Sequence, residues 1–191
     1  MDTQELDSEI TRLLAAGDRD AAATFALRGF GPRILAYLHT VLRDEGDATE
    51  AFGEFAEKLW KGLDSFRGES SFRVWAFRMA WNTALDLRKQ AWNRRVRRMV
   101  TGEASRIAEE VRNATVLRRE QQRQGLEKLR EELSAEDQAL LTLRIDQELS
   151  WAEIAQVLEP EGAPDPATLR KRFERLKLRL AERARELGLI E

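Results

Sequence analysis

The spacing of apolar residues is the feature that most constrains how this chain can fold. Apolar side chains recur three or four positions apart along almost the whole sequence, for example at Ile10, Leu13 and Leu14, and this spacing gathers them on one face of an α-helix. The alternation of apolar and polar residues that marks a strand is missing. Breaks between helices are expected where Gly and Pro occur, at Gly17, residues 29–32, Gly46, Gly62 and Gly68. The sequence therefore predicts an all-α protein, with four or five helices before residue 98.

A polar segment divides the chain in two. Residues 99–125 are rich in charges of both signs and poor in aromatic residues, a composition typical of a connection between domains. The 191 residues of the chain are enough for two small domains. We therefore expect helical domains at residues 1–98 and 126–191, joined by a linker at residues 99–125.

The chain contains no cysteine and a single histidine, His39. It can therefore form no disulfide, thiolate nucleophile or cysteine metal site. His39 lies at the edge of a predicted amphipathic helix with no second ligand nearby, so neither a metal site nor a cofactor is expected. The N-terminus is acidic, unlike a signal peptide, and no apolar run approaches the ~20 residues that span a bilayer. We expect a cytoplasmic protein with no membrane insertion.

The net charge of −2 conceals a strong separation of charges along the chain. Residues 1–64 hold 7 basic and 13 acidic side chains, whereas residues 67–106 hold 10 basic and 3 acidic ones. A second basic cluster, at residues 167–179, holds 6 basic side chains and 1 acidic one. Such clusters suit binding to a nucleic-acid backbone, although a solvated helix face can have the same composition.

Two short helices joined by a turn are predicted near the C-terminus. Ser150 and Glu153 have the spacing of a capping box, which opens the helix WAEIAQVL. Asp165 and Pro166 place a good N-cap before a proline at the first helical position, and TLRKRFERLKLRL follows. Because the second helix is basic, the pair predicts a helix-turn-helix.

A further helix is predicted before this pair. Ser134 and Asp137 resemble a capping box with a shorter acid. The apolar set expected in the helix that they open is Leu140, Leu141, Leu143 and Ile145.

The first basic cluster falls on a helix predicted to begin near Phe72. The preceding FRGESS, residues 66–71, is a break in which Ser70 or Ser71 can cap that helix. Its buried stripe is expected to exclude Trp81, Asn82 and the arginines, and Trp75 is expected in the core rather than on a binding surface. The expected stripe is Phe72, Trp75, Ala76, Met79 and Ala80.

Two parts of the sequence resemble one family. The run LDSFRGESSFRVWAFRMAWNTALDLRK, residues 63–89, resembles the promoter-melting region of the extracytoplasmic-function sigma factors, the group IV members of the sigma-seventy family. DQALLTLRIDQELSWAEIAQVL followed by ATLRKRFERLK is similar to that family's C-terminal region. The resemblance covers about residues 8–98 and 126–187. In the first run it is carried by the Ser-Phe before Trp75, Phe77, Arg78, Met79, Ala80, Asn82, Ala84, Asp86 and Arg88.

The resemblance implies an RNA polymerase sigma factor with no enzymatic activity of its own. Such a protein binds core polymerase, directs sequence-specific promoter recognition and opens the DNA at transcription initiation. Residues 1–98 would then be the region 2-like domain, which binds core polymerase and recognises and melts the minus-ten element. Residues 126–191 would be the region 4-like domain, which recognises the minus-thirty-five element. The implied partners are core RNA polymerase and promoter DNA, and an anti-sigma factor is left open.

The resemblance also implies site residues. Asn82 is the candidate for reading a flipped base, because its amide can both donate and accept on a base edge, and the cations near it would hold phosphates. The minus-ten set is Arg67, Ser70, Ser71, Arg78, Trp81, Asn82, Asp86, Arg88, Lys89, Arg94 and Arg95. The minus-thirty-five set is Thr168, toward a phosphate, with Arg170, Lys171, Arg172 and Arg175 toward base edges in the major groove. The core polymerase-binding set, on a helix expected at residues 47–61, is Asp47, Glu50, Glu54 and Glu57.

The sequence departs from the family at two places. Gly53 stands where the family usually has glutamine, and EPEGAP, residues 159–164, lengthens the turn of the helix-turn-helix. Two other functions stay open. A conventional helix-turn-helix regulator leaves the run from Trp75 to Asp86 unexplained, and a nucleic-acid-processing enzyme needs a cluster of metal-binding carboxylates or a nucleophile that the sequence does not show.

Overall fold

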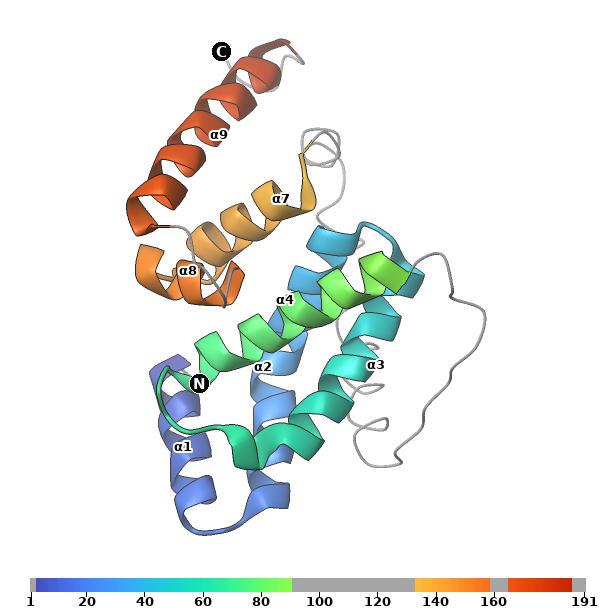
Figure 1. Cartoon of the computed structure of the whole chain (residues 1–191), viewed down its shortest axis with the longest axis vertical. Coiled ribbons are helices and arrows are strands. Elements are labelled where there is room, and N and C mark those ends of the chain that lie inside the picture. The colour runs from blue at the N-terminus through green and yellow to red at the C-terminus, as the bar shows by residue number, and fades with distance from the viewer. Residues whose placement is uncertain (1–2, 91–132, 159–164, 187–191) are drawn as a thin grey trace. The chain divides into compact units, whose positions relative to one another are not determined.

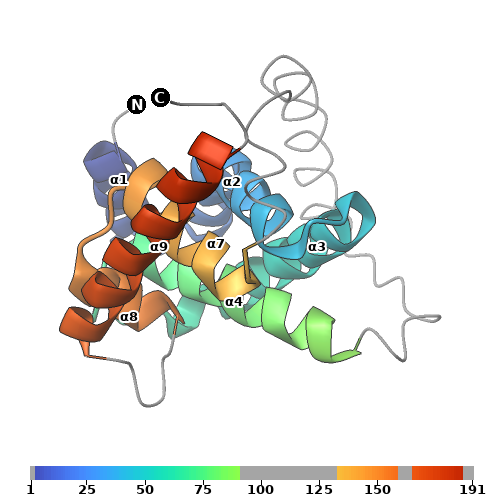
Figure 2. The same cartoon turned by 90° about the horizontal axis from the view of Figure 1, so that it is seen from above.

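The computed structural model describes residues 3–90, 133–158 and 165–186. The chain divides into two compact units, Met1–Leu117 and Arg118–Glu191, and the regular elements of the described residues are all helices, as predicted (Figures 1 and 2). The predicted domain ends at residues 98 and 126 lie outside the described residues. The first unit contains α1 (Thr3–Ala15), α2 (Arg19–Leu42), α3 (Glu45–Gly62), η1 (Leu63–Ser65) and α4 (Phe72–Gln90). The second contains α7 (Ala135–Leu141), η2 (Thr142–Asp146), α8 (Trp151–Leu158) and α9 (Pro166–Glu186).

The core of the first unit is aromatic and lies between α2, α3 and α4, with α1 packed against α2 and α4 (Figure 1). Tyr37 of α2 meets Phe77 of α4 edge to face, with ring centroids 5.4 Å apart. Phe52 and Phe55 of α3 are stacked at 6.0 Å. These four rings are fully buried, so the three longest helices of the unit are held by shared apolar contact.

The expected break at residues 29–32 is wrong, because α2 continues through it. Gly29 lies where α1 approaches closely: a Cβ at this position would come within 2.6 Å of a Leu6 methyl. An interior proline such as Pro32 costs a helix about 3 kcal/mol. Buried side chains on both sides of it, including Phe30 and Ile34, offset that cost. Glycine at this place serves helix packing rather than chain reversal.

Helix α3 begins two residues earlier than the predicted start at Asp47. The side chain of Asp44 accepts a hydrogen bond from the Asp47 N–H at 2.7 Å, and α3 therefore starts at Glu45. Its predicted apolar stripe is buried, and Gly53 lies in its interior. At the other end, Arg19 donates to the carbonyl oxygens of Trp60 and Lys61 at 3.1 and 2.9 Å. The last turn of α3 is thus capped by the first residue of α2.

The predicted helix starts of the second unit are confirmed. The Ser150 N–H donates to Glu153 at 2.8 Å, and the Glu153 N–H donates to Ser150 Oγ at 3.3 Å, which completes the capping box of α8. Helix α9 begins at Pro166. The Thr168 N–H donates to the Asp165 carbonyl oxygen at 2.8 Å. The long turn at residues 159–164 lies outside the described residues.

One expected core residue of the second unit is on the surface. Ile145 is 58% exposed, whereas Leu140 and Leu143 are fully buried. The chain forms a π-helical turn at η2, and the wider turn changes the angular position of the residues that follow. Ile145 therefore leaves the apolar face on which regular α-helical spacing would have placed it.

None of the described helices combines the length and apolar character required to cross a membrane.

Candidate nucleic-acid interfaces

One exposed face of α4 carries four of the predicted minus-ten residues. Arg78, Asn82, Asp86 and Lys89 are spaced i, i+4, i+8 and i+11, which places them along one side of the helix. Asn82, Asp86 and Lys89 are exposed, and Arg78 is half-buried. We call these four residues the outer face of α4. Arg88 is exposed too but lies off this line, and Arg94 and Arg95 lie outside the described residues.

Trp81 does not belong to that surface. Its side chain is only 3% exposed, so the expectation that it lies off the buried stripe is wrong. Helix α4 packs against α1, α2 and α3 together, and a helix with three neighbours buries a wider arc than one apolar stripe. The expected core position of Trp75 is confirmed.

The 66–71 loop is anchored at its start by an aromatic cluster. The Phe66 ring lies 5.2 Å from Phe72 and 5.5 Å from Trp75, and Phe72 lies 6.1 Å from Phe30 of α2. These centroid distances are those of favourable aromatic pairs. The loop therefore leaves the core next to the first turn of α4.

The end of the 66–71 loop is a helix cap, as predicted. Ser71 Oγ accepts a hydrogen bond from the Val74 N–H at 3.2 Å. Ser70 Oγ donates to the Ser71 carbonyl oxygen at 3.3 Å. Gly68 has φ +73°, a left-handed conformation that glycine adopts without a steric penalty. Arg67 is exposed, so the loop presents a cation beside a turn of fixed geometry.

Asp7 is a residue at this site that sequence reasoning missed. Its Oδ1 accepts a hydrogen bond from the Arg73 backbone N–H at 2.9 Å. This N–H is one of the amides at the helix start that have no partner within the helix. The two residues are 66 positions apart, so no local pattern could have indicated the contact. It ties the acidic helix α1 to the start of α4, beside the 66–71 loop.

Lys58 connects α3 to α4 and was also missed. Its Nζ lies 3.3 Å from Thr83 Oγ1 and 3.6 Å from an Asp86 carboxylate oxygen. It lies 3.8 Å from Glu54 as well. The Asp86 carboxylate therefore has a cationic partner, which reduces its repulsion of an approaching phosphate.

The predicted core-binding acids share one face of α3. Asp47, Glu50, Glu54 and Glu57 are spaced i, i+3, i+7 and i+10, and we call them the acidic face of α3. Glu50 is exposed, whereas Glu57 is mostly covered and pairs with Lys61. The negative charge is therefore most accessible around Glu50.

In the second unit, α9 has one apolar side and one basic side. Leu169, Phe173 and Leu176 are buried, as expected. Thr168, Lys171 and Arg175 follow the spacing i, i+3 and i+7 and are exposed, so they lie along one side of the helix. We call these three the outer face of α9. Arg170 is exposed on another side of the helix.

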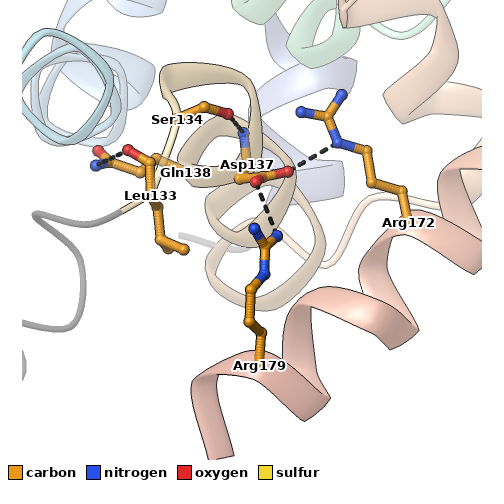
Figure 3. A network of polar contacts seen from close by, with 6 residues as sticks. All are labelled: Leu133, Ser134, Asp137, Gln138, Arg172 and Arg179. Carbon is orange, nitrogen blue, oxygen red and sulfur yellow. Dashed lines mark hydrogen bonds and ion pairs between the residues drawn. The ribbon is translucent and has the colours of Figure 1, made fainter. Parts of the chain in front are cut away.

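Arg172 differs from the other predicted readers because it has a partner within the unit. Its Nε donates to Asp137 Oδ1 at 2.7 Å, and Arg179 Nη2 donates to Asp137 Oδ2 at 3.2 Å (Figure 3). Ser134 caps α7 through the Asp137 N–H at 3.1 Å, as predicted. The interpretation of Asp137 as the acid of a capping box is wrong, because its carboxylate turns toward α9 (Figure 3).

A ladder of cations and rings joins η2, α8 and α9. The Arg144 guanidinium lies 4.8 Å from the centre of the Trp151 ring, which meets Phe173 at 5.3 Å. Lys177 lies 5.3 Å from the other ring of the pair, Phe173. Arg144 also donates to the Leu149 carbonyl oxygen at 2.8 Å. These contacts hold the two helices of the predicted helix-turn-helix together.

The described ranges contain no group of three or more His, Asp or Glu side chains placed to hold a metal ion. The arrangement is instead one of exposed cations and amides on helices with well-packed inner sides. Such surfaces suit contacts to phosphates and base edges.

Comparison with known proteins adds independent information. The family model Sigma-70 region 2 matches residues 27–94, an interval that includes α3, the 66–71 loop and the outer face of α4. The RNA polymerase sigma-H factor of Pseudomonas aeruginosa is 29% identical over 187 residues, which cover 92% of each chain. The ECF RNA polymerase sigma-E factors of Escherichia coli and Salmonella typhi are 31% identical over 90 residues, 44% of this chain and 43% of theirs.

The family match lies within the first unit. The relation to the sigma-H factor extends over nearly the whole chain, and each unit presents a basic or amide-bearing helix face on an apolar framework. Residues 27–94 are therefore a sigma-70 region 2, and these similarities support an RNA polymerase sigma factor that acts in transcription initiation.

Proposed function

We propose that this sigma factor binds core RNA polymerase and directs it to promoters with two elements, each contacted by a different unit. The observation that carries this proposal is the outer face of α4, where Arg78, Asn82 and Lys89 lie along one side of the helix. The 66–71 loop leads directly into this helix. The protein supplies binding energy rather than catalysis. It acts by stabilising the opened form of the promoter.

Asn82 is proposed to read an unpaired base of the minus-ten element. Expelling a base from the stack costs a few kcal/mol, which contacts to the expelled base must recover. The Asn82 amide is exposed and can pair with a base edge as donor and acceptor. The serines and Arg67 of the 66–71 loop are proposed to border the same base. Trp81 is buried, so its proposed role reduces to supporting the Asn82 backbone from below.

The cations around Asn82 are proposed to hold the phosphate backbone. Arg78, Arg88 and Lys89 lie on α4, and Arg94 and Arg95, which lie outside the described residues, are proposed to contact phosphates as well. Each neutralised phosphate adds sequence-independent affinity that salt weakens. Asp86 cannot contribute in this way, because its charge repels phosphates; it is proposed to accept from a base amino group while Lys58 compensates its charge.

The acidic face of α3 is proposed as a contact for core polymerase. Its exposed carboxylates would suit a basic surface on the partner, and rim charges of this kind mainly set the association rate and its dependence on salt. Because Glu50 is the most accessible acid of the face, it is expected to matter more than Glu57, which Lys61 already engages.

Helix α9 is proposed as the recognition helix for the minus-thirty-five element. Thr168 would contact a phosphate, and Lys171 and Arg175 of the outer face would reach base edges in the major groove, with Arg170 beside them. Arg172 belongs to the same predicted set, and its guanidinium already donates to Asp137 within the unit. Two weak modules on one tether gain effective concentration, so neither unit needs to bind tightly by itself.

The test of the proposal is transcription from a responsive promoter by core polymerase with and without the full chain. We expect Asn82→Ala to leave binding to the closed promoter nearly unchanged and to reduce opening, measured by permanganate reactivity of unpaired thymines. Gln4→Ala changes another exposed amide of the same unit and serves as the control. Normal permanganate reactivity with Asn82→Ala would remove this residue from the opening step.

A further inference from the structure

Asp137 is the one buried carboxylate in the part of the chain that the structure describes. Its side chain is 8% exposed. A carboxylate in such a place is costly unless cations and hydrogen bonds compensate it. Both carboxylate oxygens have arginine partners on α9, and the residue lies in the first turn of α7, where the helix dipole favours negative charge.

The two arginines contact Asp137 from successive parts of α9. Arg172 and Arg179 are seven residues apart, which places them on the same side of the helix about 10 Å apart along its axis. Figure 3 shows both guanidinium groups converging on the carboxylate from α9. Both contacts lie on one side of α9, so they oppose rotation of the helix about its own axis, and their separation along the axis also opposes sliding.

Rotation of α9 determines which side chains face outward. The outer face, Thr168, Lys171 and Arg175, lies on the side that the buried stripe of Leu169, Phe173 and Leu176 does not occupy. Apolar contacts are not directional, so the stripe alone permits some rotation and sliding. The pair of ion contacts to Asp137 is directional and selects one orientation.

The same contacts engage two cations of α9 that phosphates could otherwise bind. The side chain of Arg172 is 40% exposed and that of Arg179 is 65% exposed. Without Asp137, both guanidinium groups could turn outward into solvent and toward DNA of any sequence. Such contacts would raise affinity for all DNA without discriminating between sequences.

We propose that Asp137 is a positioning residue for promoter specificity: it holds Arg172 and Arg179 so that α9 presents its outer face in one orientation and two arginines are withheld from non-specific phosphate contacts. This inference rests on the proposed role of α9 as the recognition helix.

The effect of Asp137→Asn on DNA affinity distinguishes this role from simple electrostatics. Asp137→Asn removes one negative charge from the DNA-binding unit, and electrostatics alone predicts tighter binding to every DNA sequence by a similar factor. Positioning predicts that the ratio of affinities for the preferred and a permuted upstream element falls. We expect a fall of about tenfold, comparable to the loss of one good bidentate base contact, and a steeper dependence of binding on salt.

The experiment measures this ratio at two salt concentrations with holoenzyme assembled from core polymerase and the full chain. The matched control is Glu174→Gln, which makes the same charge change on an exposed residue of α9 whose partner is the neighbouring Lys177. We expect the control to bind both DNAs slightly more tightly with an unchanged ratio. A ratio for Asp137→Asn equal to or above that of the control would overturn the proposal.

A second variant keeps the test valid if Asp137→Asn impairs folding. Arg179→Gln removes one of the two contacts from a largely exposed side chain, so α9 is expected to stay folded, which thermal unfolding would verify. We expect its ratio to fall as well, and an unchanged ratio in both variants refutes the positioning role. If the wild-type holoenzyme itself showed no preference for the upstream element, the proposed role of α9 would fail; a wild-type preference retained by the variants defeats the inference about Asp137 alone.

Discussion

Gly53 gives the most direct test of how the first unit is built. It lies in the interior of α3, and a Cβ at this position would have no atom within 4 Å outside the helix. A glycine inside a helix costs roughly 0.5–1 kcal/mol relative to alanine, because the unfolded chain has more freedom to lose. Since no neighbour must move, Gly53→Ala should recover that amount in full.

The size of this effect can be measured against a second glycine of the same unit. At Gly29 a Cβ would come within 2.6 Å of Leu6, whose side chain is buried. The gain in helix propensity is the same at both positions, whereas overpacking a well-filled site costs typically 1–3 kcal/mol. Gly29→Ala is therefore expected to be the less stable of the two variants by about that amount, reduced by whatever movement Leu6 can make.

Urea unfolding followed by far-ultraviolet circular dichroism, with thermal unfolding beside it, measures both variants. A gain of 0.5–1 kcal/mol corresponds to a rise of about 2–8 °C in the melting temperature of a unit this small. If Gly53→Ala fails to stabilise, or Gly29→Ala stabilises as much, the reasoning from local space is wrong. Gly53→Gln extends the test to function. It restores a polar side chain next to the acidic face of α3 and should tighten core polymerase binding beyond Gly53→Ala.

Local interactions were predictable because both partners lie within three positions of each other in the sequence. The caps at Ser71, Ser134 and Ser150 each join residues three positions apart. The start of α9 at Pro166 likewise follows from the fixed backbone angle of proline. The all-α fold followed from the spacing of apolar residues for the same reason.

Long-range contacts could not be predicted, and they account for the errors. Asp137 has the spacing of a capping acid, but its partners lie 35 and 42 positions further along the chain. At this position two guanidinium groups on α9 outcompete one backbone N–H, since hydrogen bonds between charged groups are the stronger ones. The prediction for Trp81 was wrong because the width of the buried side of α4 depends on how many helices pack against it. The sequence of α4 alone does not indicate that number.

Two further predictions concern buried and long-range polar contacts of the first unit. The Tyr37 hydroxyl is buried and has no hydrogen-bond partner among the described residues, so Tyr37→Phe should raise the free energy of unfolding by about 1 kcal/mol in urea titrations. Burial also raises the pKa of Tyr37 well above its usual value, so above about pH 10, the ordinary tyrosine pKa, only the unfolded state releases the proton. The free energy of unfolding of the wild type should therefore fall with pH above about 10 more steeply than that of Tyr37→Phe. Equal pH dependence of the two proteins would contradict this. Asp7→Ala removes the acceptor that holds the Arg73 N–H, so it should lower the stability of the unit by about 0.5–2 kcal/mol, as loss of a helix cap does. Because this contact lies beside the 66–71 loop, the same change should slow promoter opening in permanganate assays more than it weakens core binding; a loss confined to core binding would show that α1 supports the unit without reaching the loop.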